Sequence, residues 1–143
     1  MMETMKIIDA YDYGGMGYAP FLIGDKWQVA FLNYAPEEAL ESIVKLDVHH
    51  YTDEVFVLLD GRAALIGAQV DDGGVAYEAV DMRPLCAYNI RRGVWHKIAM
   101  QPGSRVLIVE NCNTHLGDFE FYDLSAEQIA ALRETVVKVW SEE

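Results

Sequence analysis

Two neighbouring histidines and a glutamate are the first residues of this sequence whose types and spacing could do chemistry. They lie in the stretch HHYTDEVFVLLDG, residues 49–61, where Glu54 follows His50 by four positions. A further histidine, His96, lies in the later stretch GVWHKI. Two imidazoles and one carboxylate form a donor set that holds divalent transition metals and leaves open positions for a ligand. The spacing therefore predicts a metal centre with His50, Glu54 and His96 as ligands.

The residues around Glu54 indicate a β-strand rather than a helix, because they are rich in aromatic and β-branched types and end at an Asp-Gly turn. Side chains alternate along a strand, so His50 and Glu54 are expected on one face. A buried carboxylate is costly unless a cation neutralises it. His49 has the opposite parity and becomes an optional fourth ligand only if the strand bulges. The alternative is a metal-free polar cluster, or a solvated barrel mouth that carries His49 and His50.

The elements that must position these side chains are predicted to be strands. Short apolar or alternating segments recur between turn signals such as Asp60-Gly61, the DDGG of residues 71–74 and Pro102-Gly103. The segments are 27–34, 42–49, 54–59, 62–70, 75–82, 94–100, 105–111 and 119–124. About eight strands at this spacing favour an all-β antiparallel barrel or jelly roll rather than a βαβ fold.

The two ends of the chain differ from this pattern. Residues 125–143 predict a C-terminal α-helix, with Ser125 and Gln128 in a capping-box pattern and apolar residues at helical spacing. Residues 1–26 predict an irregular N-terminal arm, whose stretch YDYGGMGYAP is either a flap over a pocket or an ordinary surface loop. We therefore expect one domain over residues 1–143: an arm (1–26), a barrel (27–124) and a helix (125–143).

Two motifs in this sequence resemble those of the cupin superfamily. In HHYTDEVFVLLDG, the residues His50, Glu54 and Gly61 match the second histidine, the glutamate and the glycine of the first cupin motif. In RRGVWHKI, Gly93 and His96 match the glycine and histidine of the second motif, although Arg91 replaces its proline and Met100 replaces an asparagine that often follows. The resemblance covers roughly residues 27–113 and implies a small barrel with a divalent metal ion.

The first histidine of the first motif falls at Val48, which cannot bind metal. The implied four-ligand set is thus incomplete, and His49 is its only replacement. The metal itself is not fixed, because imidazole with carboxylate accepts zinc, iron, manganese or nickel.

Other polar residues near the motifs are expected outside the centre. Lys97 has the opposite parity to His96 and should point away from it, and Asp53 beside Glu54 should face outward. His115 follows a strand end and is interpreted as a surface residue. Asn111 and Asn113 could face the pocket by parity, but the solvated-loop interpretation is favoured. Cys86 lacks the context of a nucleophile and is interpreted as a small buried residue.

Composition limits the partners. The 143 residues are 52% hydrophobic and carry a formal net charge of −12, which repels nucleic acid and anionic membrane surfaces. The first 15 residues have no apolar signal segment, and Cys86 and Cys112 form no CxxC pair, so a reducing cytoplasmic location is expected. The strands at 54–59 and 105–110 are apolar on both faces, so one face must be covered by the C-terminal helix or by another subunit, and the resemblance to cupins favours a homodimer.

These observations predict a divalent metal-binding cupin that acts on, or binds, a small polar molecule such as a sugar-like compound or a keto or hydroxy acid. If it is an enzyme, it is a metal-dependent isomerase or epimerase, or an oxygenase. The alternatives are a non-catalytic small-molecule-binding barrel and a metal-free sugar isomerase or epimerase of cupin type. The histidine motif of cupin sugar-nucleotide ketoisomerases is not matched by KLDVHHYTDE. The sequence names neither the substrate nor the catalytic residues.

Overall fold

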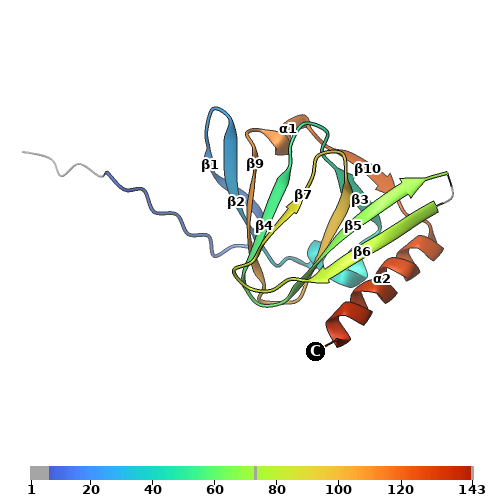
Figure 1. Cartoon of the computed structure of the whole chain (residues 1–143). Coiled ribbons are helices and arrows are strands. Elements are labelled where there is room, and N and C mark those ends of the chain that lie inside the picture. The colour runs from blue at the N-terminus through green and yellow to red at the C-terminus, as the bar shows by residue number, and fades with distance from the viewer. Residues whose placement is uncertain (1–6, 73, 143) are drawn as a thin grey trace, which may run out of the picture.

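The computed structural model describes residues 7–72 and 74–142, which fold into two antiparallel five-stranded sheets and a C-terminal helix (Figure 1). The first sheet has the order β1 (Gly17–Ile23), β2 (Trp27–Asn33), β9 (Arg105–Asn111), β4 (Glu54–Asp60) and β7 (Ala87–Ile90). The second has the order β10 (Glu120–Asp123), β3 (Lys45–Val48), β8 (Trp95–Met100), β5 (Ala63–Asp71) and β6 (Gly74–Asp81). The predicted all-β jelly roll with a C-terminal helix is confirmed.

The core between the sheets follows from the alternation along their strands. Phe56 and Leu58 of β4 and Val106 and Ile108 of β9 point inward from the first sheet, and Leu65 is among the residues they meet from the second. Because each strand presents every second side chain to this space, one apolar parity per strand is enough to build it.

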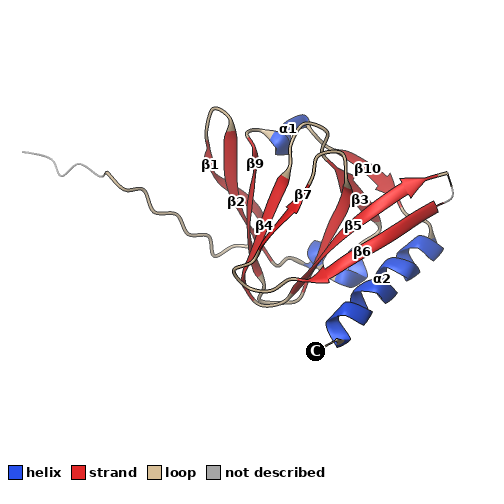
Figure 2. Cartoon of the chain, viewed as in Figure 1, coloured by secondary structure: helices blue, strands red, loops and turns tan. Residues whose placement is uncertain are grey.

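The helix α2 (Ala126–Ser141) covers the outer face of the second sheet (Figure 2). Its Leu132 and Val136 are completely buried against a second cluster that includes Ile66 and Ala99. Both hydrogen bonds of the capping box at Ser125 form, as the sequence predicts. The helix therefore accounts for the second apolar face of β5 and β8. None of the described helices is long and apolar enough to cross a membrane.

Two strands and three short helices were not predicted. β1 lies within the segment that was expected to be an irregular arm, and of the described arm residues 7–16 and 24–26 are irregular. β7 pairs with β4 at the edge of the first sheet. The strand predicted over 42–49 is shorter, because the 3₁₀ helices η1 (Pro36–Glu38) and η2 (Leu40–Ser42) precede β3. The four-residue helix α1 (Thr114–Gly117) joins β9 to β10.

Candidate metal centre

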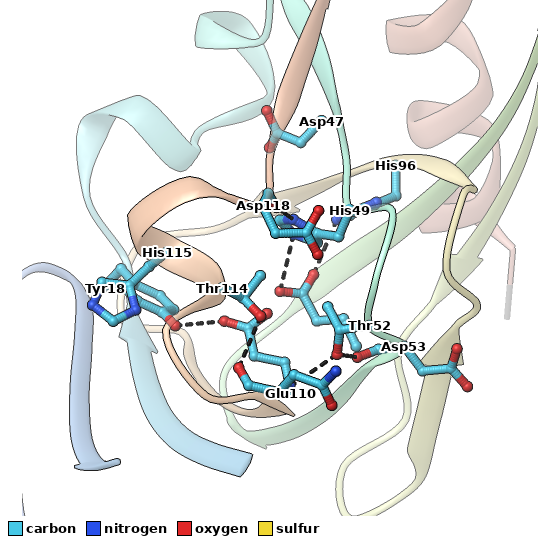
Figure 3. A network of polar contacts seen from close by, with 12 residues as sticks. Tyr18, Asp47, His49, Thr52, Asp53, His96, Glu110, Thr114, His115 and Asp118 are labelled. Atoms are coloured by element: carbon cyan, nitrogen blue, oxygen red, sulfur yellow. Dashed lines mark hydrogen bonds and ion pairs between the residues drawn. The ribbon is translucent and has the colours of Figure 1, made fainter. Parts of the chain in front are cut away.

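The side chains of His49, Glu54 and His96 meet at one end of the barrel. His49 directly follows β3, Glu54 is the first residue of β4, and His96 lies in β8. Nε2 of His96 lies 3.0 Å from Oε1 of Glu54, and Nε2 of His49 lies 3.5 Å from Oε2 of the same carboxylate. One candidate ligand atom from each residue lies within 4.8 Å of the others. We call these three residues the triad (Figure 3 labels His49 and His96).

Backbone carbonyl groups orient both imidazoles of the triad. Nδ1 of His49 lies 2.6 Å from the carbonyl oxygen of Asp118, and Nδ1 of His96 lies 3.0 Å from that of Val94. A carbonyl can only accept, so each Nδ1 carries the proton and donates it. In the neutral imidazole, Nε2 then turns a lone pair toward Glu54, and lone pairs at these distances repel unless a proton or a cation lies between them. This is the outer-sphere arrangement that fixes metal-binding histidines.

The electrostatics of the triad favour an ionised Glu54. Its side chain is 6% exposed, and burial would raise the pKa of its carboxyl, but hydrogen bonds from His49 and His96 outweigh burial and hold the pKa below its usual range. Burial would lower the pKa of His49, but the hydrogen bond to Glu54 and the charge of Glu54 raise it to about 9. Without a metal, His49 is thus a protonated partner of Glu54 over most of the physiological pH range.

His50 lies outside the triad, and the expectation that it faces inward with Glu54 is wrong. It is exposed, and its Nε2 lies 3.2 Å from Oε1 of Glu120 on β10. Strand alternation cannot be counted back from Glu54, because β3 ends at Val48 and residues 49–53 form a loop. The Asp118 carboxylate holds this loop by accepting hydrogen bonds from the backbone N–H groups of His50 and Tyr51. The loop turns His49 inward.

The register of the first cupin motif shifts with His49. When His49 stands for the second histidine of that motif, the position of the first falls on Asp47, two residues earlier in β3. Oδ2 of Asp47 lies 3.2 Å from Nζ of Lys97, and its Oδ1 is buried without a hydrogen bond. Lys97 was expected to point away from the site, but it contacts Asp47, and both residues line the cavity that the triad also lines. β3 and β8 share one residue pair, Asp47 with His96, and the long side chain of Lys97 spans the gap between the two strands.

A second group of polar residues lies beside the triad, and no sequence motif predicts it. Glu110 of β9 is the cross-strand neighbour of Glu54, and both are buried. Oε1 of Glu110 accepts hydrogen bonds from Oη of Tyr18 at 2.7 Å and from Nε2 of Gln28 at 3.1 Å. Nε2 of Gln28 also lies 3.1 Å from Nδ1 of His115. We call Tyr18, Gln28, Glu110 and His115 the second polar group (Figure 3 labels all but Gln28).

Glu110 differs from Glu54 in its expected protonation. Burial raises the pKa of the Glu110 carboxyl to about 8, and its hydrogen bond with the neighbouring Glu54 and the charge of Glu54 add to this effect. Two neighbouring buried carboxylates cannot both ionise at low cost. Near neutral pH, Glu54 is therefore the ionised carboxylate and Glu110 the neutral acid. Burial and the hydrogen bond to Glu110 also raise the pKa of Tyr18.

The triad lines one cavity of about 190 Å³ together with Tyr18, Glu110 and His115 of the second polar group. Leu32, Phe56, Ile98 and Ile108 form its apolar wall. His115, expected at the surface, is half-buried and belongs to this lining. The expected placements of Asp53, Asn111 and Asn113 agree with the structure, because all three are exposed.

A wider hollow of about 580 Å³ lies along β5, β6 and the segment 91–95. Within the described residues the one possible metal-binding cluster is the triad, so this hollow has no comparable chemistry.

Comparison with known proteins shows the fold of this chain. No family model and no curated protein matches the sequence. A hydroquinone 1,2-dioxygenase from Sphingomonas sp. TTNP3, solved with 4-hydroxybenzoate bound, matches with a TM-score of 0.52 and 9% identity over 78% of this chain and 83% of that one. A TDP-quinovose 3,4-ketoisomerase from Campylobacter jejuni, WlaRB, matches with 0.50 and 15% identity over 72% and 73%.

A cupin-2 domain protein from Shewanella frigidimarina matches with a TM-score of 0.48 and 20% identity over 68% of this chain and 83% of that one. The chain has the two-sheet jelly-roll fold that the two motifs imply, and it shares this fold with the dioxygenase and the ketoisomerase. Identities this low show the fold alone, so the function must be argued from the residues of this chain.

Proposed function

We propose that this protein is a divalent metal-binding cupin whose metal is held by His49, Glu54 and His96. The observation that carries the proposal is the orientation of the two imidazoles. Both Nδ1–H groups donate to backbone carbonyls, and both Nε2 atoms face one buried carboxylate. A cation between these three side chains would satisfy all of them at once, whereas the metal-free protein must use protons for the same purpose.

The donor set suits zinc, iron, manganese or nickel and does not select among them. A metal bound there would polarise an oxygen atom of a ligand in the open coordination positions. The chain's own residues bind and enclose that ligand: the apolar wall excludes water on one side, and the second polar group offers hydrogen bonds on another. The proposed ligand is a small polar molecule, because a cavity of about 190 Å³ lies below the roughly 300–1,000 Å³ of sites for drug-sized ligands.

Metal content per chain tests the ligand set. We expect metal in the wild type and near-complete loss in His49→Ala and His96→Ala, because either change leaves only one imidazole. Glu54→Gln should bind metal much more weakly while the barrel keeps its shape. His50→Ala is the matched control and should keep the wild-type content, because His50 contacts Glu120 outside the triad.

Purified protein without a histidine tag would be loaded with zinc or cobalt, dialysed and measured by elemental mass spectrometry, with circular dichroism as the check on folding. Full occupancy in folded His96→Ala would contradict the triad. Equal losses in His49→Ala and His50→Ala would contradict the assignment of His49.

Two roles are compatible with such a centre: an enzyme of the isomerase, epimerase or oxygenase type, or a non-catalytic binding module. The same barrel serves many functions, so the fold does not choose between them. Metal-loaded protein would be screened by thermal shift against sugars, sugar acids and keto acids, and each mixture analysed by mass spectrometry. A binding module raises its melting temperature and returns the compound unchanged, whereas an enzyme converts it only with metal present.

The homodimer remains part of the proposal, and the outer face of the first sheet supports it. Cross-strand pairs place Val29, Val109 and Val55 in one row and Phe31, Leu107 and Val57 in the next. We call these six residues the apolar face. α2 covers the second sheet, and these six side chains remain only half-buried in the single chain. A second copy would remove this apolar surface from water.

Leu107→Glu tests the dimer, because it places a charge at the centre of the apolar face. We expect the wild type to have the dimer mass by light scattering at micromolar concentration and the variant to have the monomer mass. Val137→Glu on the exposed side of α2 is the control. A wild type that is monomeric throughout contradicts the dimer.

The proposed cytoplasmic location rests on Cys86 and Cys112, which are both unpaired.

A further inference from the structure

Asp118 contacts the loop after β3 in three places, and one of these contacts is with the ring of His49 (Figure 3). Its backbone carbonyl oxygen accepts a hydrogen bond from Nδ1–H of His49, with the two heavy atoms 2.6 Å apart. Its two side-chain oxygens accept the backbone N–H groups of His50 at 2.8 Å and Tyr51 at 3.0 Å. One residue therefore holds both the ring of a candidate metal ligand and the backbone beside it.

The position of Asp118 is fixed from outside this loop, by α1 on one side and β10 on the other. Its backbone N–H donates to the carbonyl oxygen of Thr114 at 3.1 Å and closes α1. β10 pairs with β3 so that Glu120 lies opposite Val48. The same antiparallel register, continued by two residues, brings Asp118 opposite His50. Asp118 thus reaches the loop from a segment with its own supports.

The carbonyl contact decides how the ring of His49 faces the centre. An imidazole on its Cβ has two broad orientations, related by a half-turn about χ2. In the observed orientation Nδ1–H meets the carbonyl of Asp118, and Nε2 lies 3.5 Å from Oε2 of Glu54. A half-turn would bring a ring carbon to the carbonyl and move Nε2 off its line to Glu54. The hydrogen bond therefore selects the orientation that can bind a metal.

His96 is oriented in a similar way but by a local contact. Its Nδ1 lies 3.0 Å from the carbonyl oxygen of Val94, which is two residues away in the chain. The partner of His49, by contrast, is 69 residues away. The orientation of His49 consequently depends on how the loop and the segment of Asp118 are held together, whereas that of His96 does not.

We propose that Asp118 is a positioning residue of the metal centre, whose side chain holds the loop so that its carbonyl group can orient His49 for the metal. This inference rests on the proposed metal centre and adds to it a residue that binds no metal itself. Outer partners of metal-binding histidines contribute to affinity because they fix the ring before the metal arrives. The side chain of Asp118 contributes indirectly, by holding the backbone on which the ring stands.

Zinc affinity, measured by competition with a coloured chelator, tests the role of the side chain. Asp118→Ala removes both acceptor oxygens and leaves the carbonyl group, and should weaken zinc binding by about 10- to 100-fold, as for other outer partners of metal ligands. Asp118→Asn keeps one acceptor oxygen and should lose less. Asp81→Ala is the matched control: Asp81 is a carboxylate on β6 that pairs with Arg62, and its loss should leave the zinc affinity unchanged.

A second measurement separates positioning from general damage and needs no metal. In protein labelled with ¹⁵N-histidine and kept with a chelator, the Nδ1–H protons of His49 and His96 are both hydrogen-bonded to carbonyls. The His49 signal is assigned by its absence in His49→Gln. In Asp118→Ala this proton should exchange with water about tenfold faster, as for two weakened or lost hydrogen bonds. The His96 proton is the internal control and should keep its exchange rate.

Wild-type zinc affinity in folded Asp118→Ala overturns the inference. Equal acceleration of both histidine protons also overturns it, because the change would then loosen the whole site, and so does an equal loss of zinc affinity in Asp81→Ala. A wild type that binds no zinc overturns the metal centre, and the inference with it. In that case the exchange of the His49 proton still shows whether Asp118 orients the ring, so the two failures are distinguishable.

Discussion

The stability of the metal-free protein should fall as the pH rises from 6.5 to above 9. The pKa of His49 is raised from 6.5 to about 9 in the fold, so the folded state holds its proton over a range in which the unfolded chain releases it. A group of this kind stabilises the fold fully below pH 6.5, and the contribution is lost as the pH rises through about 9. The raised pKa of Glu110, about 8, acts with the same sign.

The size of the effect follows from the same values. At about 1.4 kcal/mol per pH unit, a rise from 6.5 to about 9 gives at most about 3.5 kcal/mol for His49, whose side chain is 14% exposed. Glu110 and His49 both face Glu54, so their contributions are not additive, and about 3.5 kcal/mol stands for the group as a whole. The lowered pKa of Glu54 acts only below its usual range, outside this window.

Urea unfolding with a chelator present, at pH 6.5, 7.5, 8.5 and 9.5, measures this loss directly. His49→Gln removes the titrating group and should flatten much of the slope, whereas His50→Gln should retain it. Saturating zinc should flatten the slope that His49 causes, because the metal displaces the proton from His49, and the rise in its apparent affinity, up to about tenfold per pH unit below pH 9, offsets the loss of stability in the metal-free protein. A chelated wild type whose stability is constant or rises over this range would refute the electrostatic assignment.

Three further changes test the scaffold by chemical denaturation. Leu132→Ala removes a completely buried side chain from the interface between α2 and the second sheet and should cost about 2–5 kcal/mol, whereas exposed Val137→Ala should change stability by less than about 0.5 kcal/mol. Gly61→Ala should destabilise the fold more than Gly103→Ala. Both glycines have positive φ, but only at Gly61 would an added Cβ clash with a neighbour, at 2.6 Å from the Cα of Ser104. Ser125→Ala should cost about 1 kcal/mol through loss of the cap, and no loss would show that the capping box is energetically neutral.

Much of the fold could be predicted from the sequence, because its information is local. The turn at Asp60-Gly61, the alternation in β4 and β9 and the capping box at Ser125 each depend on residues that are neighbours along the chain. β1 and β7 were missed because they are edge strands, whose formation depends on the strand beside them rather than on a strong pattern of their own.

The sequence by itself determined that a carboxylate, Glu54, and an imidazole, His96, occupy inward positions of their strands, because alternation along a strand fixes the face of each side chain. Only the tertiary structure decided between His49 and His50, since Asp118 sets the loop after β3: its carbonyl oxygen contacts His49, 69 residues away in the sequence, and its carboxylate accepts from His50, 68 residues away. Only the register of β9 against β4 brought Glu110 beside Glu54. Contacts between distant strands leave no local pattern, and the composition of the site therefore emerged only when the sheets were paired.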